Sequence, residues 1–196
     1  ELSPAVTEVT ISYDSLTVTQ PIKVADAFKG IGTAEDPYLI ESADDLVKLS
    51  ELVASGVHFK GEFIKMVNDI ELPSGWTPVG SSTDARFKGT FDGGGKLLTV
   101  PAGGLPLFGY VGGATIKNLN VYGTQIAGYG LINHFDELDE NTADKGVSIS
   151  RITLKSGSST LKSGLLGSEF TTNPYAGSTR SSEAHISGCT IESGVV

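Results

Sequence analysis

The sequence predicts an all-β fold, a parallel β-helix in which the chain winds into stacked coils of short strands. Three observations predict this fold class. Short apolar stretches alternate with polar residues as strands do, an apolar spacing recurs along the chain, and 25 glycines among 196 residues mark frequent turns. One α-helix is predicted, and we expect it to cap the N-terminal end of the coils.

The recurring spacing is clearest in Ile116–Gly123, where apolar residues take the first, fourth and sixth positions and a glycine follows. The step from fourth to sixth is strand alternation, whereas the step from first to fourth breaks it and predicts a corner. Asn118 and Gly188 fall at this corner and tolerate a left-handed backbone, while Arg151 at the matching place is a departure. The other copies are Val67, Ile70 and Leu72; Leu98 and Val100, which keep the last two positions; Ile149, Ile152 and Leu154; and Ile186, Cys189 and Ile191.

A second set of segments falls between these strands and predicts a second face of each coil. Each member has a leucine followed by an apolar residue, with small or turn-forming residues around them: Pro106–Gly109, Gly130–Asn133 and Gly164–Gly167. Equivalent strand residues lie 21 positions apart from Leu98 to Leu119 but 37 apart from Ile152 to Cys189. Polar loops at the corners would explain this variation, since long surface insertions cost little entropy. The expected insertions are Ser81–Arg86, Asp136–Gly146 and Thr171–Ala184.

The N-terminal part of the chain contains the one predicted helix, over residues 42–54. Ser42 is the expected N-cap, with Asp45 three residues on. Leu46, Leu49, Leu52 and Val53 form its apolar stripe. Residues 1–29, which include an alternating stretch from Val9 to Val18 that ends before Pro21, are predicted to form a β segment, a linker or a cap. Residues 30–196 are predicted to form the β-helix, and we expect its C-terminal end to be truncated or covered by a partner.

Seven short segments follow one another in a characteristic order: Gly32–Ile40, Asn68–Leu72, Trp76–Gly80, Phe87–Gly95, Leu107–Val111, Ile116–Leu119 and Gly164–Gly167. In this order they resemble bacterial surface proteins with GLUG-type repeats, which are named for a Gly-Leu-any-Gly core. The resemblance is close over Gly30–Gly123 and looser beyond it. It implies a pectate-lyase-like, right-handed parallel β-helix on large secreted or wall-anchored proteins, often with a role in adhesion, and therefore an extracellular or cell-surface location.

The composition excludes some functions. A formal net charge of -9 repels phosphate backbones, so we expect no nucleic-acid partner. No apolar run approaches the roughly 18 residues of a membrane span, so we expect the chain not to be transmembrane. The single cysteine, Cys189, excludes an intramolecular disulfide and a thiolate metal cluster.

Two sets of acidic residues are candidates for chemistry. Asp69 and Asp92 lie beside strand ends, where they could pair for acid–base work or a cation site. Turn residues that bond the local backbone are the favoured interpretation. An acidic insertion could bind calcium, but it lacks the alternating order of a preformed calcium loop, so a solvated loop is favoured. Its acidic residues are Asp136, Glu137, Asp139, Glu140 and Asp144.

The remaining candidates also have simpler structural interpretations. The histidines, His58, His134 and His185, lie in different segments without metal-pair spacing, which favours surface placement. Cys189 takes the core position of Leu119 and Ile152, so we expect a buried small side chain and not a nucleophile. The stretch Asp92–Gly95 lacks the lysine and the following helix of a phosphate loop and predicts a tight turn. Five aromatic residues could form a sugar-binding platform if they share a face, although packing is favoured: Trp76, Tyr110, Tyr122, Tyr129 and Tyr175.

The sequence therefore predicts no catalytic residue, no metal ligand and no cofactor. The leading hypothesis is a non-catalytic surface or secreted module that acts in adhesion or ligand presentation, with host or bacterial surface glycans or proteins as partners. One alternative is a carbohydrate-binding or polysaccharide-degrading protein, although nothing places Arg86, Arg151 or Arg180 beside an aspartate pair as a lyase requires. The other is a structural module that assembles through its C-terminal end.

Overall fold

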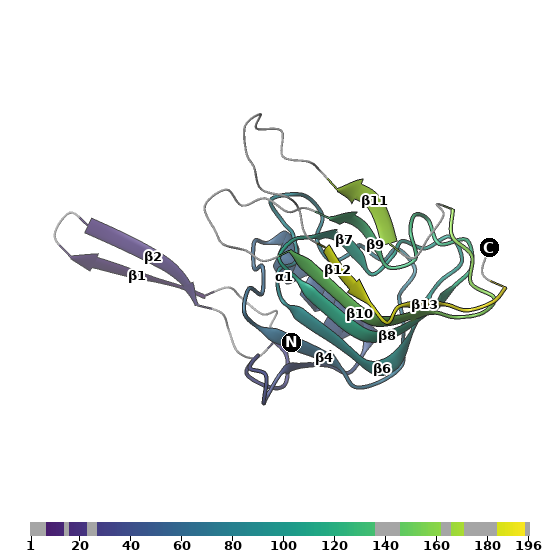
Figure 1. The fold of residues 1–196 in the computed structure, drawn as a ribbon. Coiled ribbons are helices and arrows are strands. Elements are labelled where there is room, and N and C mark those ends of the chain that lie inside the picture. Colours follow the sequence, from purple (N-terminus) through teal and green to yellow (C-terminus); the bar gives the residue numbers. More distant parts are fainter. Residues whose placement is uncertain are drawn as a thin grey trace.

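The computed structural model describes residues 7–13, 16–22, 27–135, 146–161, 166–170 and 184–194. In these residues strands predominate and there is one α-helix, α1 (Ala43–Ala54). Strands β1 (Thr7–Tyr13) and β2 (Leu16–Ile22) form an antiparallel pair, and all other pairs of strands are parallel (Figure 1). The prediction of a β-rich, mostly parallel fold with one helix is confirmed.

The larger parallel sheet takes one or two strands from each pass of the chain. Its main order is β12-β10-β8-β6-β4-β3, while β5 pairs with β6 and β13 pairs with β10. Its strands are β3 (Tyr38–Ile40), β4 (Phe63–Met66), β5 (Ile70–Glu71), β6 (Thr90–Val100), β8 (Thr115–Gly123), β10 (Val147–Leu154), β12 (Ala184–Ser187) and β13 (Thr190–Ile191).

The smaller parallel sheet has the order β11-β9-β7, with β7 (Phe108–Val111), β9 (Ile132–Phe135) and β11 (Leu166–Phe170). The chain visits the two sheets alternately from β6 to β12. Phe108 pairs with Ile132, and Ile132 with Leu166, so the second set of apolar segments forms a second face as predicted.

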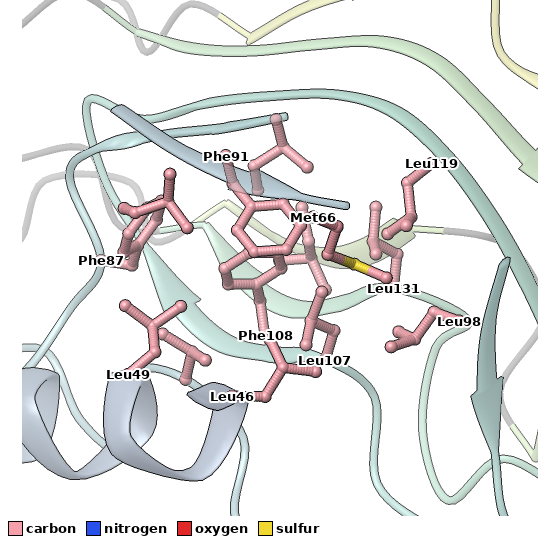
Figure 2. Close-up of a cluster of buried hydrophobic side chains, with 14 of the residues drawn as sticks. Leu46, Leu49, Met66, Phe87, Phe91, Leu98, Leu107, Phe108, Leu119 and Leu131 are labelled. Atoms are coloured by element: carbon pink, nitrogen blue, oxygen red, sulfur yellow. The ribbon is translucent and has the colours of Figure 1, made fainter. Parts of the chain in front are cut away.

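Apolar side chains stack in register between the two sheets. Phe91, Ile116 and Ile149 lie side by side on β6, β8 and β10, and each is fully buried. The ring of Phe108 from the smaller sheet contacts Phe91 edge-on at 5.4 Å between ring centroids, and it lies at the same distance from Phe87 (Figure 2). The core is therefore built from ladders of like residues, because parallel strands in register place equivalent side chains next to each other.

The predicted corner is present in β8, in β10 and in the segment between β12 and β13. Asn118 and Gly188 have left-handed backbones, with φ of 55° and 61°, and Arg151 adopts the same conformation with φ of 53°. The corner geometry therefore holds at Arg151 too, although its Cβ makes a left-handed backbone unfavourable and its side chain lacks the local hydrogen bonding that helps asparagine. Its cost must be offset by the strand pairing on both sides of the corner.

In β6 the same corner is made by glycines and contains extra residues. Asp92 pairs with Lys117 and Lys96 pairs with Leu119, so β6 advances four residues where β8 advances two. Gly94 and Gly95 have φ of 60° and 71°. The stretch Asp92–Gly95 is thus a bulge inside a continuous strand, which corrects the predicted tight turn.

The observed register also corrects the predicted alignment of two copies of the apolar spacing, the copy with Ile70 and the copy with Leu98 and Val100. Leu98 pairs with Val121, not with Leu119, and Val100 pairs with Gly123. Ile70 pairs with Leu98, so it also matches the sixth position of the spacing instead of the fourth. The later copies agree with the prediction, since Ile116 pairs with Ile149, and Ile149 pairs with Ile186.

Helix α1 begins where its capping residues predict. The Ser42 hydroxyl accepts a hydrogen bond from the Asp45 amide, and the Asp45 carboxylate accepts one from the Ser42 amide. Leu46, Leu49 and Val53 are fully buried, and Figure 2 shows Leu46 and Leu49 directed toward the phenylalanine cluster. The helix contacts β3, the last strand at that edge of the larger sheet.

Two further predictions need correction. The stretch from Val9 to Val18 does not form one strand: Val9–Tyr13 lie in β1 and Leu16–Val18 lie in β2. Pro21 lies inside β2 opposite Glu8, which a two-stranded edge tolerates. Cys189 is half-buried and not fully buried, because in the described residues no strand lies beyond β12 and β13 to cover it.

Candidate functional site

Polar side chains from three successive strands meet on the outside of the corner of the larger sheet. We call this group the corner ladder: Asp92 on β6, Lys117 and Asn118 on β8, and Arg151 on β10. Register places these residues side by side, since Asp92 pairs with Lys117 and the left-handed positions Asn118 and Arg151 lie between paired neighbours. In the described residues, the ladder brings together side chains of both charges from three neighbouring strands.

Hydrogen bonds hold the corner ladder in one arrangement. Asp92 Oδ1 accepts from the Gly94 amide at 2.9 Å and from Asn118 Nδ2 at 2.9 Å. Lys117 Nζ lies 3.5 Å from Asp92 Oδ2. Arg151 Nε donates to Asn118 Oδ1, so the amide of Asn118 joins the acid of one strand to the guanidinium of another. The amide group can do this because it carries both a donor and an acceptor.

The electrostatics of the ladder keep Asp92 ionised. Burial raises the pKa of Asp92, but the hydrogen bonds from Asn118 and from the Gly94 amide, together with Lys117, outweigh burial and leave the pKa below its ordinary value. A carboxylate in this state is a poor proton donor near neutral pH. The ladder therefore suits hydrogen bonding and charge pairing with a partner rather than proton transfer.

Asp69, the other predicted acid candidate, also bonds to the backbone. Its Oδ1 accepts from the Leu97 amide at 2.9 Å. Asp92 thus makes the local backbone contact expected of a turn residue, whereas Asp69 bonds to the backbone of β6, 28 positions along the chain, and not to its own turn. In the described part of the chain, no three residues among His, Cys, Asp and Glu come close enough together to hold a metal ion. The acidic insertion from Asp136 to Asp144 lies outside the described residues.

The three histidines lie in separate places. His58 is half-buried, and its Nδ1 lies 2.9 Å from the Arg86 carbonyl oxygen. The His134 ring stacks on Tyr110 at 4.4 Å, because the two residues pair in register between β9 and β7. His185 is exposed on β12. The structure does not bring these side chains together as ligands of one site.

The aromatic candidates for sugar binding do not share a face among the described residues. Trp76 is buried, and its indole donates to the Pro106 carbonyl oxygen at 3.0 Å. Tyr110 lies on the smaller sheet and Tyr122 on the larger one. Tyr129 is half-buried, and Tyr175 lies outside the described residues, as does Arg180. Packing, the favoured role, accounts for Trp76.

Sequence reasoning missed a cavity of about 190 Å³ between α1 and the Pro73–Thr77 turn. Val47 and Ala54 line it from the helix, Trp76 lines it from the turn, and Glu51 is also part of the wall. The Ser50 hydroxyl fixes the two walls relative to each other by donating to the Thr77 carbonyl oxygen at 2.9 Å. The corner ladder was missed too, although its left-handed positions were identified, because its members converge only once the glycine bulge sets the register.

Comparisons with known proteins give partial matches. A protein of Evansella cellulosilytica, whose name describes it as a Gly-rich membrane protein, is 32% identical over 111 residues, covering 50% of this chain and 12% of that protein. The halomucin of Haloquadratum walsbyi is 29% identical over 118 residues, covering 52% of this chain and 1% of halomucin. The chain thus spans a small fraction of the length of these relatives. No family model matches the chain, and no solved structure matches it.

The described residues contain no helix with both the length and the apolar character needed to cross a membrane.

Proposed function

We propose that residues 30–196 form a right-handed parallel β-helix of the GLUG-repeat kind, with α1 as the cap of its N-terminal end. In-register parallel pairing, buried ladders of like residues and the alternation between two sheets support this proposal. The left-handed corners at equivalent positions of β8, β10 and the segment between β12 and β13 support it further, since each pass of the chain bends at the same place.

The function proposed is that of a non-catalytic module of a secreted or cell-surface protein, acting in adhesion or in the presentation of a ligand. The observation that carries this proposal is the corner ladder, a fixed outward group whose acid is ionised and hydrogen-bonded and whose cations reach the surface. The names of the two relatives, a membrane protein and a halomucin, are consistent with a place at the cell surface.

A binding assay and a turnover assay on the same purified chain test this function. The chain is immobilised and exposed to an array of acidic and neutral glycans and to extracellular glycoproteins, while the same polysaccharides in solution are assayed for released chain ends. We expect saturable retention of at least one ligand class and no release of chain ends.

Two variants sharpen the assay. Arg151→Ala removes the exposed guanidinium of the corner ladder, and we expect it to weaken retention severalfold. Lys48→Ala removes a cation of α1 that is paired with Asp45, as Lys117 is with Asp92, and we expect no change. Chain-end release that rises in proportion to protein concentration would contradict the non-catalytic proposal, and equal loss in both variants would contradict a role for the ladder.

A further inference from the structure

The apolar ladders of the larger sheet continue into β12 and β13 but are not covered there. Ile116 and Ile149 are fully buried, whereas Ile186, next in the same ladder, is 52% exposed. The next ladder ends in the same way, since Leu154 is 1% exposed and its partner Ile191 is 55% exposed. The residues that point into the core everywhere else thus form an open apolar strip at this end.

This strip belongs to an edge that already has the shape of a coil. In the described residues, β12 and β13 pair with β10 only, so the backbone groups on their other side point away from the sheet. Gly188 gives the edge the same left-handed corner as Arg151 and Asn118. An exposed edge with apolar side chains is a template for another strand.

We propose that this edge, Ala184–Ile191, pairs with the same edge of a second copy of the chain, antiparallel and about a two-fold axis. A register with Ile186 opposite Ile191 of the other copy, and Ile191 opposite its Ile186, covers both exposed isoleucines at once. The same register sets Ser187 opposite Thr190, so that outward polar residues also meet. The edge is thereby self-complementary, as a two-fold interface requires.

The other end of the larger sheet is not available for a head-to-tail stack. Leu39 of β3 donates its amide to the Lys29 carbonyl oxygen at 2.9 Å, so that edge already has an antiparallel neighbour. Helix α1 buries Leu46 and Leu49 beside it. Of the two ends of the larger sheet in the described residues, only the open edge of a second copy is therefore available to pair with this one. The inference rests on strand pairing and burial and does not depend on the adhesion role.

The single cysteine reports on this register. With Ile186 opposite Ile191, Cys189 of each copy lies diagonally across the two-fold axis from the other. A strand spacing of about 4.8 Å and a rise of about 3.3 Å per residue put the two Cα atoms roughly 6 Å apart, within the range that a disulfide spans. Both side chains face the core side of the edge, since Cys189 packs against the core cluster.

The test combines sedimentation equilibrium with oxidation of the purified chain by copper phenanthroline. The expected results are a monomer–dimer equilibrium and a disulfide-linked dimer through Cys189. Because a net charge of -9 opposes association, both are measured at about 0.15 M salt, where charges separated by more than about 8 Å are screened. A chain that sediments as a monomer up to high concentration would overturn the proposal while leaving the proposed function untouched.

Three variants locate the contact. Ile186→Asp should weaken the dimer by about tenfold or more. Its matched control is Ile31→Asp, since Ile31 is 65% exposed but lies at the opposite, β3 end of the larger sheet and should leave the dimer unchanged. The third variant combines Cys189→Ser with Ser187→Cys. The thiol then lies on the outward side of the edge, and the two copies of residue 187 are offset by about three residues along the paired strands. The dimer should therefore form without the crosslink.

The variants can also give results that contradict the proposed interface. Far-UV circular dichroism checks that every variant keeps the fold, which we expect because Ile186 is already exposed. A dimer that Ile186→Asp does not weaken, or crosslinking that persists at position 187, would overturn this interface.

Discussion

Strands β10 and β12 have closely similar apolar residues but very different surroundings. Ile149 and Ile186 pair in register on neighbouring strands, yet Ile149 is fully buried and Ile186 is 52% exposed. Burial here is set by the presence of a strand on each side and of the smaller sheet opposite, not by the residue itself. A single pass of the chain cannot bury its own apolar face, so the stability of each strand depends on its neighbours.

The two ends of the larger sheet also differ in how their apolar residues are covered. At the β3 end, α1 contributes fully buried leucines and Lys29 pairs with Leu39, although Ile31 beside this pair stays 65% exposed. At the β12 end, the described residues leave two isoleucines more than half exposed. One end of the ladders is therefore closed within the chain, and the other is open to a partner.

The largest expected effect comes from truncating the paired isoleucines. Ile149→Ala should lower the free energy of unfolding by about 2–5 kcal/mol, because it leaves a cavity inside the stack. Ile186→Ala should cost less than about 1 kcal/mol at protein concentrations too low for association, since little burial is lost. Urea unfolding followed by circular dichroism measures both. Equal losses would mean that Ile186 is covered in the folded monomer.

The corner offers a second comparison, between an inner and an outer position. Asn118→Ala removes the amide that joins Asp92 to Arg151 and puts a less tolerant residue at φ of 55°, so we expect a loss of about 1–3 kcal/mol. Gly188→Ala faces only the backbone cost, about 1 kcal/mol, because the nearest atom to an added Cβ would be Arg151 Cγ at 3.5 Å.

Asn118→Gly separates the two contributions at the inner corner. It keeps the left-handed backbone without strain but still removes the amide, so the loss that remains belongs to the hydrogen bonds. If Asn118→Gly were as stable as the natural chain, the amide would contribute nothing and the corner ladder would be held by backbone pairing alone.

The closed end can be weakened through the cap of α1. Ser42→Ala removes the hydroxyl that accepts from the Asp45 amide, and it should cost about 1 kcal/mol. Hydrogen exchange should then increase in α1 before it increases in β8. Ser74→Ala is the control, since Ser74 is an exposed turn residue. A loss confined to the helix would show that the cap is less stable than the strands it covers.

Sequence reasoning succeeded where chemistry repeats at fixed spacing. The ladder from Ile116 through Ile149 to Ile186, the left-handed corner at Asn118 and the cap at Ser42 all follow from residue types whose local preferences agree with the fold. The second sheet was also predictable, because Phe108 and Ile132 share a leucine before and a small or turn-forming residue after.

It failed where a local irregularity decides the register. The bulge at Gly93–Gly95 adds two residues to β6, and the spacing of Leu98 and Val100 alone does not show this. A Cβ on Gly93 would lie 2.6 Å from the Asn118 carbonyl oxygen, so the glycine is required by a neighbour 25 positions away. The corner ladder depends on that register, which is why its members were found separately and not as a site.

The smallest expected effect is the acid sensitivity of two carboxylates, Asp92 in the interior of the stack and Glu192 at its open end. Burial raises the pKa of Asp92, but hydrogen bonds from Asn118 and Gly94 and the charge of Lys117 outweigh it, so the pKa falls below its ordinary 3.8. The Lys155 ammonium and the Ser156 amide lower the pKa of Glu192 below 4.5. Since both pKa values are lower in the folded state, each group stabilises the fold above its ordinary value, and that contribution is lost as the pH falls through the folded value.

Thermal unfolding between about pH 6 and pH 3 compares the two groups. Asp92→Asn should flatten the fall in melting temperature below about pH 4, and the flattening should persist in about 0.5 M salt because Asp92 is partly buried. Glu192→Gln should flatten it less, and salt should erase the difference, since the ion pair with Lys155 lies at the open end and is about one-third exposed on both partners. If salt had the same effect on the melting temperatures of both variants, the inner corner would be as solvated as the edge. The difference in burial between the interior of the stack and its open end would then not produce a difference in the strength of their ion pairs.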